Sequence, residues 1–435
     1  MMLENQNLIL PKNTIIIFHA SVGSGHKSAA HSISEAFKHL KNDENFLSNL
    51  PDYITPETFK SYNIEVLDCI DFLRWNIDGE KAANLFIGAT RPVYDLTWRY
   101  TFTGRLLWGG GTGWGRIASP KFTEYIRNKK PVAIICTHIT AANLATSAKL
   151  ITNQHFPIIC VPTDYIPEGL WPHRCTDLFC AGSEAMAEIL RPRLVHESNI
   201  AVTGIPTKIN FSKEFSQEDK NAYIHSLGVD PSKKRILILA GANYSTPYLR
   251  FRDSIENSLP YLLRQKDVHV IFVCGKDRDY LTHMSSLKAQ LQCDNLTLID
   301  YAEDVALLMS SCDFAICKPG GLTVTECLCT KTPMIILGRA YGQEKANVRM
   351  LTSTGAAMHV ITPRELIEQV GFVLSHPKSL DALVTNGSYI RRPSASIDIV
   401  RESLNKISLS NTLDRLSPKK RFFGIYIGNK PSHNR

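Results

Sequence analysis

The sequence predicts an α/β protein with two domains, each built on a parallel sheet covered by helices. Short apolar runs alternate with helical stretches along most of the 435 residues, and this alternation is typical of βαβ units. Each half opens with a strand, a glycine-bearing loop and a helix, first near residue 14 and again near residue 235. The length exceeds what one hydrophobic core normally supports. These observations predict two Rossmann-like domains that face a cleft.

The first domain is expected over residues 1–206 and the second over residues 207–380. Strands of the first are predicted at 14–18, 64–68, 131–136, 158–161, 178–181 and 201–206, with helices at 29–40 and 141–150. Strands of the second are predicted at 235–240, 268–274, 296–299, 313–317, 334–337 and 357–360. A helix-like stretch is expected at 210–227, and residues 361–408 look helical. Residues 381–435 are expected to form C-terminal helices and a basic tail.

Composition indicates a globular protein and leaves its partner open. Apolar residues make up 44% and charged residues 21% of the chain, which is ordinary for a soluble domain. The net charge of +8 suits an anionic membrane surface, nucleic acid or an acidic ligand. No apolar run reaches membrane-spanning length, and no signal peptide is visible, so we expect a cytoplasmic protein.

The cysteines predict reduced thiols and no metal site. There are eleven, an odd number, and most lie in apolar runs, which is typical of free core cysteines. Cys175 and Cys180 have His173 nearby, but their spacing matches no standard zinc pattern. We therefore expect no metal.

A glycine loop between a strand and a helix predicts a phosphate-binding site at residues 318–326. Lys318, Pro319, Gly320 and Gly321 follow the apolar run 313–317 and precede a helical run. Bare backbone N–H groups and the positive helix end suit a phosphate or diphosphate. Glu326 would lie on the first turn or so of the helix, where its carboxylate could accept from both hydroxyls of a ribose. An ordinary tight turn is the alternative.

A second polar loop follows the next predicted strand. It contains Gly342, Gln343, Glu344 and Asn347. Because neighbouring parallel strands deliver their loops to one edge of a sheet, the two loops should lie close together.

The first glycine loop, residues 19–28, has three interpretations. A phosphate-binding P-loop needs Gly-Lys-Ser, which His26 interrupts, and a dinucleotide fingerprint lacks its third glycine and its acidic residue. The third is a loop that lets a substrate approach the backbone, with His26 as a group for proton transfer. His26 as a plain surface residue of the helix is the alternative.

These motifs resemble those of a known family. Residues 318–347 resemble the nucleotide-sugar signature of glycosyltransferases that include monogalactosyldiacylglycerol synthases, bacterial processive diacylglycerol glucosyltransferases and, more distantly, MurG. Residues 20–26, Ala-Ser-Val-Gly-Ser-Gly-His, are similar to the N-terminal loop of the diacylglycerol enzymes. The resemblance covers residues 13–375. It implies the GT-B fold and inverting transfer of a hexose from a UDP-sugar to diacylglycerol, with no cofactor and no metal.

The resemblance also implies roles for individual residues. His26 is expected to be the catalytic base, with Asp164 second, either as a base or as a partner that orients His26. The donor-binding residues are expected to be Gly241, Asn243, Lys318, Gly320, Gly321, Thr323, Glu326, Gln343, Glu344 and Asn347. The acceptor-binding residues are expected to be Gly23, Gly25, His138, Trp98 and Trp108.

An aromatic and basic segment at residues 72–118 is the expected membrane-docking part. It holds four of the five tryptophans with arginines interleaved, a combination that suits a bilayer interface. A packed helical pair is the alternative, and the glycine run 109–115 has no counterpart that we can map. The tail 417–423 is also basic and aromatic, so it could adsorb to anionic lipid or remain solvated.

The expected partners are thus a UDP-sugar, diacylglycerol and anionic membrane lipids, without nucleic acid. We expect peripheral attachment to the inner face of the cell membrane. Three alternatives stay open: transfer to a polyprenyl-linked acceptor as in MurG, a P-loop NTPase, and a non-catalytic protein that binds nucleotide-sugar or lipid.

Overall fold

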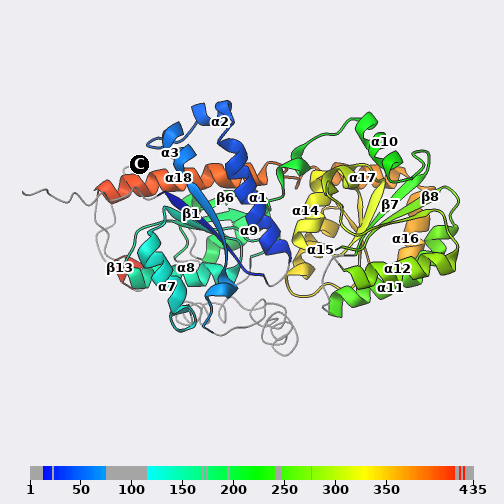
Figure 1. Cartoon of the computed structure of the whole chain (residues 1–435), viewed down its shortest axis with the longest axis horizontal. Coiled ribbons are helices and arrows are strands. Elements are labelled where there is room, and N and C mark those ends of the chain that lie inside the picture. Colours follow the sequence, from blue (N-terminus) through cyan, green and yellow to red (C-terminus); the bar gives the residue numbers. More distant parts are fainter. Residues whose placement is uncertain are drawn as a thin grey trace, which may run out of the picture.

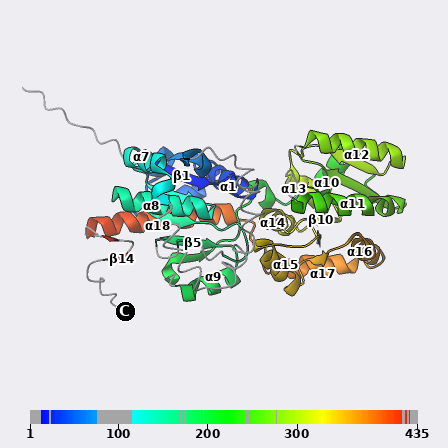
Figure 2. The same ribbon diagram turned by 90° about the horizontal axis from the view of Figure 1, so that it is seen from below.

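The computed structural model describes residues 13–21, 24–74, 115–167, 171–172, 175–193, 196–240, 246–275, 277–416, 421–422 and 425–426. Two domains lie side by side along the long axis of the molecule (Figures 1 and 2).

The N-terminal domain contains a six-stranded sheet in the order β2-β1-β3-β4-β5-β6. All of its neighbouring strands pair in parallel. The strands are β1 (Thr14–His19), β2 (Asn63–Asp68), β3 (Ala133–Cys136), β4 (Ile158–Cys160), β5 (Leu178–Ala181) and β6 (Ile200–Val202). The main helices are α1 (Ser24–Leu40), α2 (Glu44–Ser48), α3 (Pro56–Ser61), α7 (Pro120–Lys129), α8 (Ile139–Thr152) and α9 (Glu184–Leu190). Short 3₁₀ turns are η1 (Cys69–Phe72), η2 (Arg191–Arg193) and η3 (Glu197–Asn199).

The C-terminal domain contains a second parallel six-stranded sheet in the order β12-β11-β10-β7-β8-β9. The strands are β7 (Lys234–Leu239), β8 (Val268–Val273), β9 (Leu296–Ile299), β10 (Phe314–Cys317), β11 (Met334–Leu337) and β12 (Met358–Val360). The helices are α10 (Gln217–Ser226), α11 (Thr246–Arg264), α12 (Arg278–Leu291), α13 (Val305–Ser310), α14 (Gly321–Cys329), α15 (Gln343–Ser353), α16 (Pro363–Ser375) and α17 (Lys378–Gly387). The connection from the first domain includes η4 (Ile209–Ser212).

Burial on both faces explains why these strands read as continuous apolar runs. Every residue of β1, β3, β5, β10 and β11 is buried, as expected for parallel sheets that are covered by helices on both sides. Each sheet has one apolar cluster on each face. The expectation of an α/β protein with two Rossmann-like sheets is confirmed.

Strand order places the ligand-binding loops. In both sheets the order reverses next to the first strand of the domain, between β1 and β3 and between β7 and β10. Open α/β sheets bind ligands beyond the carboxyl ends of the strands at such a switch point. The loops that follow β1 and β10 are the two glycine loops singled out in the sequence.

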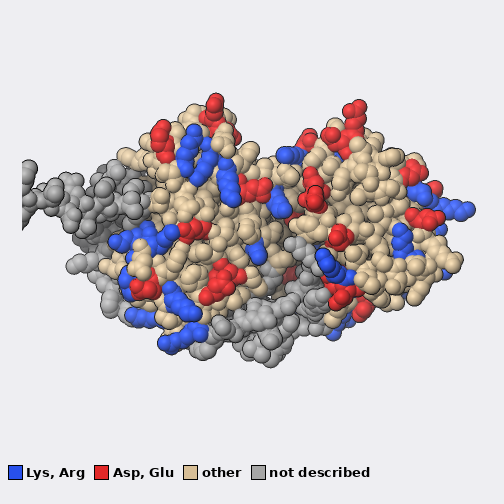
Figure 3. Space-filling view, in the orientation of Figure 1, with Lys and Arg blue, Asp and Glu red and all other residues tan. Residues whose placement is uncertain are grey.

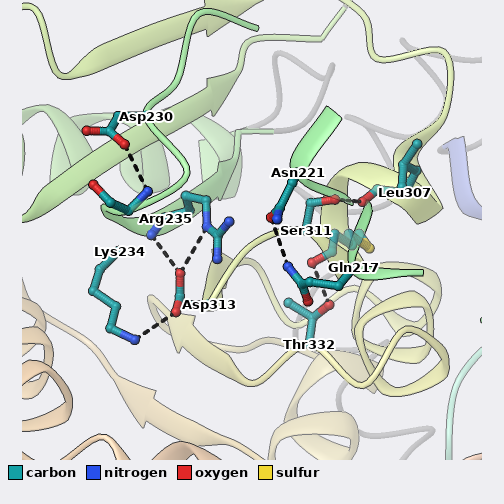
Figure 4. Close-up of polar contacts among 11 residues, drawn as sticks. Gln217, Asn221, Asp230, Lys234, Arg235, Leu307, Ser311, Asp313 and Thr332 are labelled. Carbon is teal, nitrogen blue, oxygen red and sulfur yellow. Dashed lines mark hydrogen bonds and ion pairs between the residues drawn. The ribbon is translucent and has the colours of Figure 1, made fainter. Parts of the chain in front are cut away.

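Ion pairs fix the opposite end of the C-terminal sheet. Asp313, just before β10, accepts from the backbone N of Arg235 at 2.8 Å and pairs with the side chains of Arg235 and Lys234 at 3.2 and 3.1 Å (Figure 4). This carboxylate fastens the start of β10 to the start of β7. The two strands that flank the switch point therefore begin in register.

The last long helix, α18 (Ala395–Leu416), returns to the N-terminal domain and lies beside α1 (Figure 1). Ile399, Val400, Leu404 and Ile407 belong to the apolar cluster between α1 and the first sheet. Ser396 donates to the carbonyl of Thr207 at 2.5 Å. Thus part of the segment expected as separate C-terminal helices completes the core of the first domain.

Several boundaries differ from the expectations. Helix α1 begins at Ser24 rather than near Ala29, so it includes His26. The stretch 210–227 is divided between η4 and α10, and the stretch 361–408 between α16, α17 and α18. In the tail, β13 (Arg421–Phe422) pairs antiparallel with β14 (Ile425–Tyr426). Most of the segment 72–118, including residues 109–114 of the glycine run, lies outside the described residues, as do 417–420 and 423.

The described surface mixes the two signs of charge on the face seen in Figure 3. No described helix combines the length and apolar character that a membrane span requires.

The packing of α18 predicts a large effect from its buried face. Leu404→Ala should lower the free energy of unfolding by about 2–5 kcal/mol, because a fully buried leucine leaves a cavity when truncated. Leu409→Ala is the matched control on the same helix, since Leu409 is 57% exposed. Urea unfolding monitored by circular dichroism compares them, and equal effects of the two substitutions would contradict the packing of α18 on the N-terminal core.

Candidate active site at the domain boundary

His26 lies in the first turn of α1, where it is held from two other loops. Its Nδ1 is 2.9 Å from the carbonyl oxygen of Thr137 and 3.0 Å from Oγ1 of Thr163. The hydroxyl of Thr137 donates in return to the backbone carbonyl of His26 at 3.0 Å. A carbonyl oxygen only accepts, so the hydrogen-bond network assigns the proton of the neutral ring to Nδ1. Nε2 then carries the free lone pair.

A second histidine packs against the ring of His26. The ring centroids of His26 and His138 are 4.5 Å apart with an interplanar angle of 78°. Nδ1 of His138 accepts from the backbone N of Thr140 at 3.1 Å and thereby caps the N-terminus of α8. The structure thus places His138, which was expected to bind the acceptor substrate, next to His26, the expected base.

Burial keeps both rings neutral at ordinary pH. Desolvation lowers the pKa of His26 to about 4, against a smaller opposing effect of the Thr137 carbonyl. Desolvation and the neighbouring His26 hold the pKa of His138 well below its usual value. A neutral His26 with a free Nε2 can accept a proton.

The phosphate-binding loop predicted after β10 faces this region from the other domain. Gly320 is the N-cap of α14, and Gly321 is the first residue of the helix. A Cβ on Gly321 would lie 2.0 Å from the carbonyl oxygen of Thr163 and 3.0 Å from Oδ1 of Asp164. A Cβ on Gly320 would meet no atom within 4 Å. Gly321 is therefore needed for close contact between the domains, and Gly320 leaves open space at the helix end.

Asp164 lies at the domain boundary and bonds to Asn347. The Nδ2 of Asn347 donates to Oδ1 of Asp164 at 2.9 Å and to the carbonyl of Pro319 at 3.1 Å. Its Oδ1 accepts from the backbone N of Tyr165 at 3.0 Å. Burial raises the pKa of Asp164 to about 6, the bond from Asn347 opposes this, and Glu344 adds to it. The hydrogen bond from this loop to His26 comes from Thr163, the residue before Asp164.

The other described residues that were expected to bind the donor lie just before α14 or on the first two turns of α14 and α15. Lys318 Nζ lies 3.6 Å from Oε1 of Glu344, and burial lowers the pKa of Lys318 while Glu344 raises it. Glu326 is on the second turn of α14, slightly later than expected. Burial raises its pKa to about 7, against a smaller effect of Lys208. Gln343 is the first residue of α15, and Thr323 lies on the first turn of α14.

Other expected site residues differ in how far the structure describes them. Gly25 lies on the first turn of α1, where an added Cβ would be 3.9 Å from Leu322 of α14. Gly23, Trp98, Trp108, Gly241 and Asn243 lie outside the described residues. Among those that are described, no group of three or more His, Cys, Asp or Glu side chains is placed to hold a metal ion.

Sequence reasoning did not assign roles to Thr163, Tyr165 or Thr325. The hydroxyls of Tyr165 and Thr325 lie 2.9 Å apart across the domain boundary. Thr163 and Tyr165 flank Asp164 at the end of a predicted strand, which was the available signal. The sequence could not show which side of the boundary each one would contact.

Two family models match different parts of the chain. Residues 26–207 match the monogalactosyldiacylglycerol (MGDG) synthase family, and residues 235–389 match the glycosyltransferase family 28 C-terminal domain. The first part of the chain thus matches the domain of MGDG synthases, and the second part matches the C-terminal domain of glycosyltransferase family 28. A processive diacylglycerol beta-glucosyltransferase of Bacillus licheniformis is 29% identical over 68% of this chain and 78% of its own length. The enzyme of that name from Bacillus subtilis is 24% identical over 90% of this chain and 95% of its own length.

Solved structures show that the chain has the GT-B fold. Acinetobacter baumannii MurG superposes with a TM-score of 0.53 and 17% identity, covering 90% of this chain and 98% of MurG. Anabaena HepE in complex with UDP and glucose superposes with a TM-score of 0.52 and 15% identity, and the match covers 92% of this chain and 99% of HepE. UDP-N-acetylglucosamine 2-epimerase of Neisseria meningitidis superposes with a TM-score of 0.53 and 13% identity, and the match covers 89% of this chain and 98% of the epimerase. Because an epimerase is among the proteins that share the fold, the fold alone does not identify the reaction.

The contact at Gly321 predicts a large difference between adjacent glycines. Gly321→Ala should destabilise the ligand-free protein by about 1–3 kcal/mol, because the new Cβ overlaps the carbonyl of Thr163. Gly320→Ala is the matched control and should have a much smaller effect. Thermal unfolding without nucleotide compares them, and a similar melting temperature for the two variants would show that the domains do not meet at Gly321.

The buried ring of His26 predicts acid-sensitive stability. Its pKa is about 4 in the folded protein and near 6.5 when unfolded, so the unfolded chain binds the extra proton as pH falls below 6.5. The contribution of the neutral His26 ring to the free energy of unfolding is therefore lost as the pH falls from about 6.5 to about 4. When the pH is lowered from 7 to 5, the free energy of unfolding of His26→Asn should fall by about 1–2 kcal/mol less than that of the wild type. Asp164 and Glu326 shift stability in the opposite sense but are common to both proteins. Parallel pH profiles from denaturant titration would contradict the buried neutral ring.

Proposed function

We propose that this chain transfers a hexose from a UDP-sugar to the free hydroxyl of diacylglycerol with inversion at the anomeric carbon. The supporting relatives are named diacylglycerol glucosyltransferases, and the fold neighbour HepE was solved with UDP and glucose. The observation that carries the proposal is the arrangement at the domain boundary. A neutral histidine with its free nitrogen fixed lies close to a glycine-rich helix N-terminus of the other domain.

His26 supplies the base in this reaction. The acceptor oxygen attacks the anomeric carbon while Nε2 takes the hydroxyl proton, and the bond to the diphosphate oxygen breaks with its electron pair leaving on UDP. The carbonyl of Thr137 keeps the proton of the resting ring on Nδ1. Asp164 is the second candidate for the base, and its raised pKa would suit that role near neutral pH.

The end of α14 stabilises the leaving diphosphate. This nine-residue helix has no side-chain cap, so its first backbone N–H groups point to the loop with the positive end of the helix dipole. Lys318 adds a positive charge next to the same loop. We expect the reaction to proceed without a metal ion and without a cofactor, since these groups can bear the charge of departing UDP.

The donor is held by polar side chains of α14 and α15. Glu326 is proposed to accept hydrogen bonds from the ribose hydroxyls. Gln343 and Glu344 are proposed to form hydrogen bonds with the hydroxyls of the sugar. Gly241 and Asn243 remain proposed contacts to the donor. Asn347 differs, because both donor positions and one acceptor position of its amide are used within the protein.

We further propose that the protein is cytoplasmic and works attached to the inner face of the cell membrane. Trp98 and Trp108 in the aromatic segment are the proposed lipid contacts, and anionic lipids are the proposed attracting surface for a chain of net charge +8. The relatives act on a membrane lipid by name, which supports this location. Nucleic acid is not an expected partner.

The decisive assay supplies radiolabelled UDP-glucose and other UDP-sugars with diacylglycerol in anionic liposomes, with and without EDTA. We expect a labelled glycolipid in both conditions. His26→Ala should lower kcat about 10²–10⁴-fold, because a general base contributes this much, and leave UDP affinity within about threefold.

Other outcomes identify the alternatives. Transfer only to a polyprenyl-linked acceptor would indicate a MurG-like reaction. UDP binding without any product would indicate a non-catalytic protein, and binding of ATP with magnesium in place of UDP would indicate an NTPase. Full transfer by both His26→Ala and Asp164→Ala would overturn the assignment of the base.

A further inference from the structure

The loop after β4 contacts the catalytic histidine on one side and the donor-binding helices on the other. Thr163, Asp164 and Tyr165 follow one another in this loop, and Thr163 and Tyr165 are only 6% and 1% exposed. Neither residue has a place in the reaction described so far. Both are polar groups in a nearly dry boundary, where each hydrogen bond restricts geometry strongly.

Thr163 is connected to His26 through its hydroxyl. Oγ1 of Thr163 lies 3.0 Å from Nδ1 of His26, beside the carbonyl of Thr137 at 2.9 Å. The Nδ1–H group thus has two acceptors, one from each loop, and the ring is held in its plane from both. This fixes the direction of Nε2, which must meet the acceptor hydroxyl.

The next two residues are connected to the donor domain. The amide of Asn347, which is fully buried, donates to Asp164 and accepts from the backbone N of Tyr165. The hydroxyl of Tyr165 reaches Thr325, whose own hydroxyl donates to the carbonyl of Gly321 at 2.6 Å. The carbonyl of Thr163 packs against Gly321 itself.

We propose that Thr163 is a positioning residue for His26, and that contact of the loop 163–165 with Asn347 and α14 sets the direction of the histidine ring. The inference rests on the proposed transferase function. A donor that orders α14 and α15 would, through Asn347 and Tyr165, also order the loop that holds the base. Base placement is then coupled to occupation of the donor site.

The test compares two substitutions at one position. Thr163→Val keeps the shape and removes the hydroxyl, so kcat should fall about 10–100-fold while KM for the UDP-sugar changes less than about threefold. Thr163→Ser keeps the hydroxyl and should retain most of the wild-type kcat. Unchanged kcat in Thr163→Val, or an equal loss in Thr163→Ser, would overturn the positioning role.

A matched control separates catalysis from folding. Thr176 is a buried threonine of the same domain whose hydroxyl donates to the carbonyl of Pro172 at 2.9 Å. Thr176→Val should lower the melting temperature with kcat unchanged. A loss of kcat in Thr176→Val equal to that in Thr163→Val would show that general destabilisation is the cause, and would overturn the proposal.

A double-mutant cycle tests the coupling to the donor domain. Asn347→Leu removes the amide that joins the loop to α15, and residues that act as one unit give less than multiplicative losses. The kcat of Thr163→Val with Asn347→Leu should therefore be close to that of the worse single variant. Fully multiplicative losses would overturn the coupling. Wild-type protein that makes no glycolipid would instead reject the proposed function, which keeps the two failures distinct.

Discussion

The contact of Gly321 with the carbonyl of Thr163 is the constraint on which the site depends. A helix N-terminus can bind a diphosphate only if its first N–H groups remain open, and a base can serve the same reaction only if it is near. With no side chain at Gly321, the backbone of α14 packs directly on the loop that holds His26. Asn347 completes this contact with two hydrogen bonds to the loop, at Asp164 and Tyr165, and a third to Pro319 beside α14. The proposed base and the proposed diphosphate site thereby meet at one boundary.

Burial at this boundary also shifts the pKa values of the groups that are proposed to react. The same loss of water lowers the pKa of His26 to about 4 and raises those of Asp164 and Glu326 to about 6 and 7. Without ligand, each group thus tends to its uncharged form. A neutral histidine is what a base requires, and a carboxyl that titrates near neutrality can still accept from sugar hydroxyls.

The sequence predicted the sheets and the glycine loops well because these features are local. A β-branched run, a glycine turn and a helix lie within about ten residues, and strand order then delivers the loops to one edge. His26 lies in the first of these loops, and its role as the base is a prediction from the family resemblance. The roles of Thr163 and Asn347 could not be predicted, since their partners are 137 and 183 residues away along the chain. The start of α1 and the return of α18 likewise depend on tertiary packing.

The two connections between the domains lie against each other, which limits how the boundary can open. The chain crosses once near Gly204 and returns near Arg392, and a Cβ on Gly204 would lie 2.5 Å from the Cβ of Arg392. Gly204 also has φ of +91°, a conformation that favours glycine. Beside it, Ser396 of α18 donates to the carbonyl of Thr207 of the first crossing. Because two segments cross at one place, rotation about that place is the softest relative motion. Such a rotation would open or close the contact at Gly321 as a whole, so His26 and the donor loop would separate or meet together.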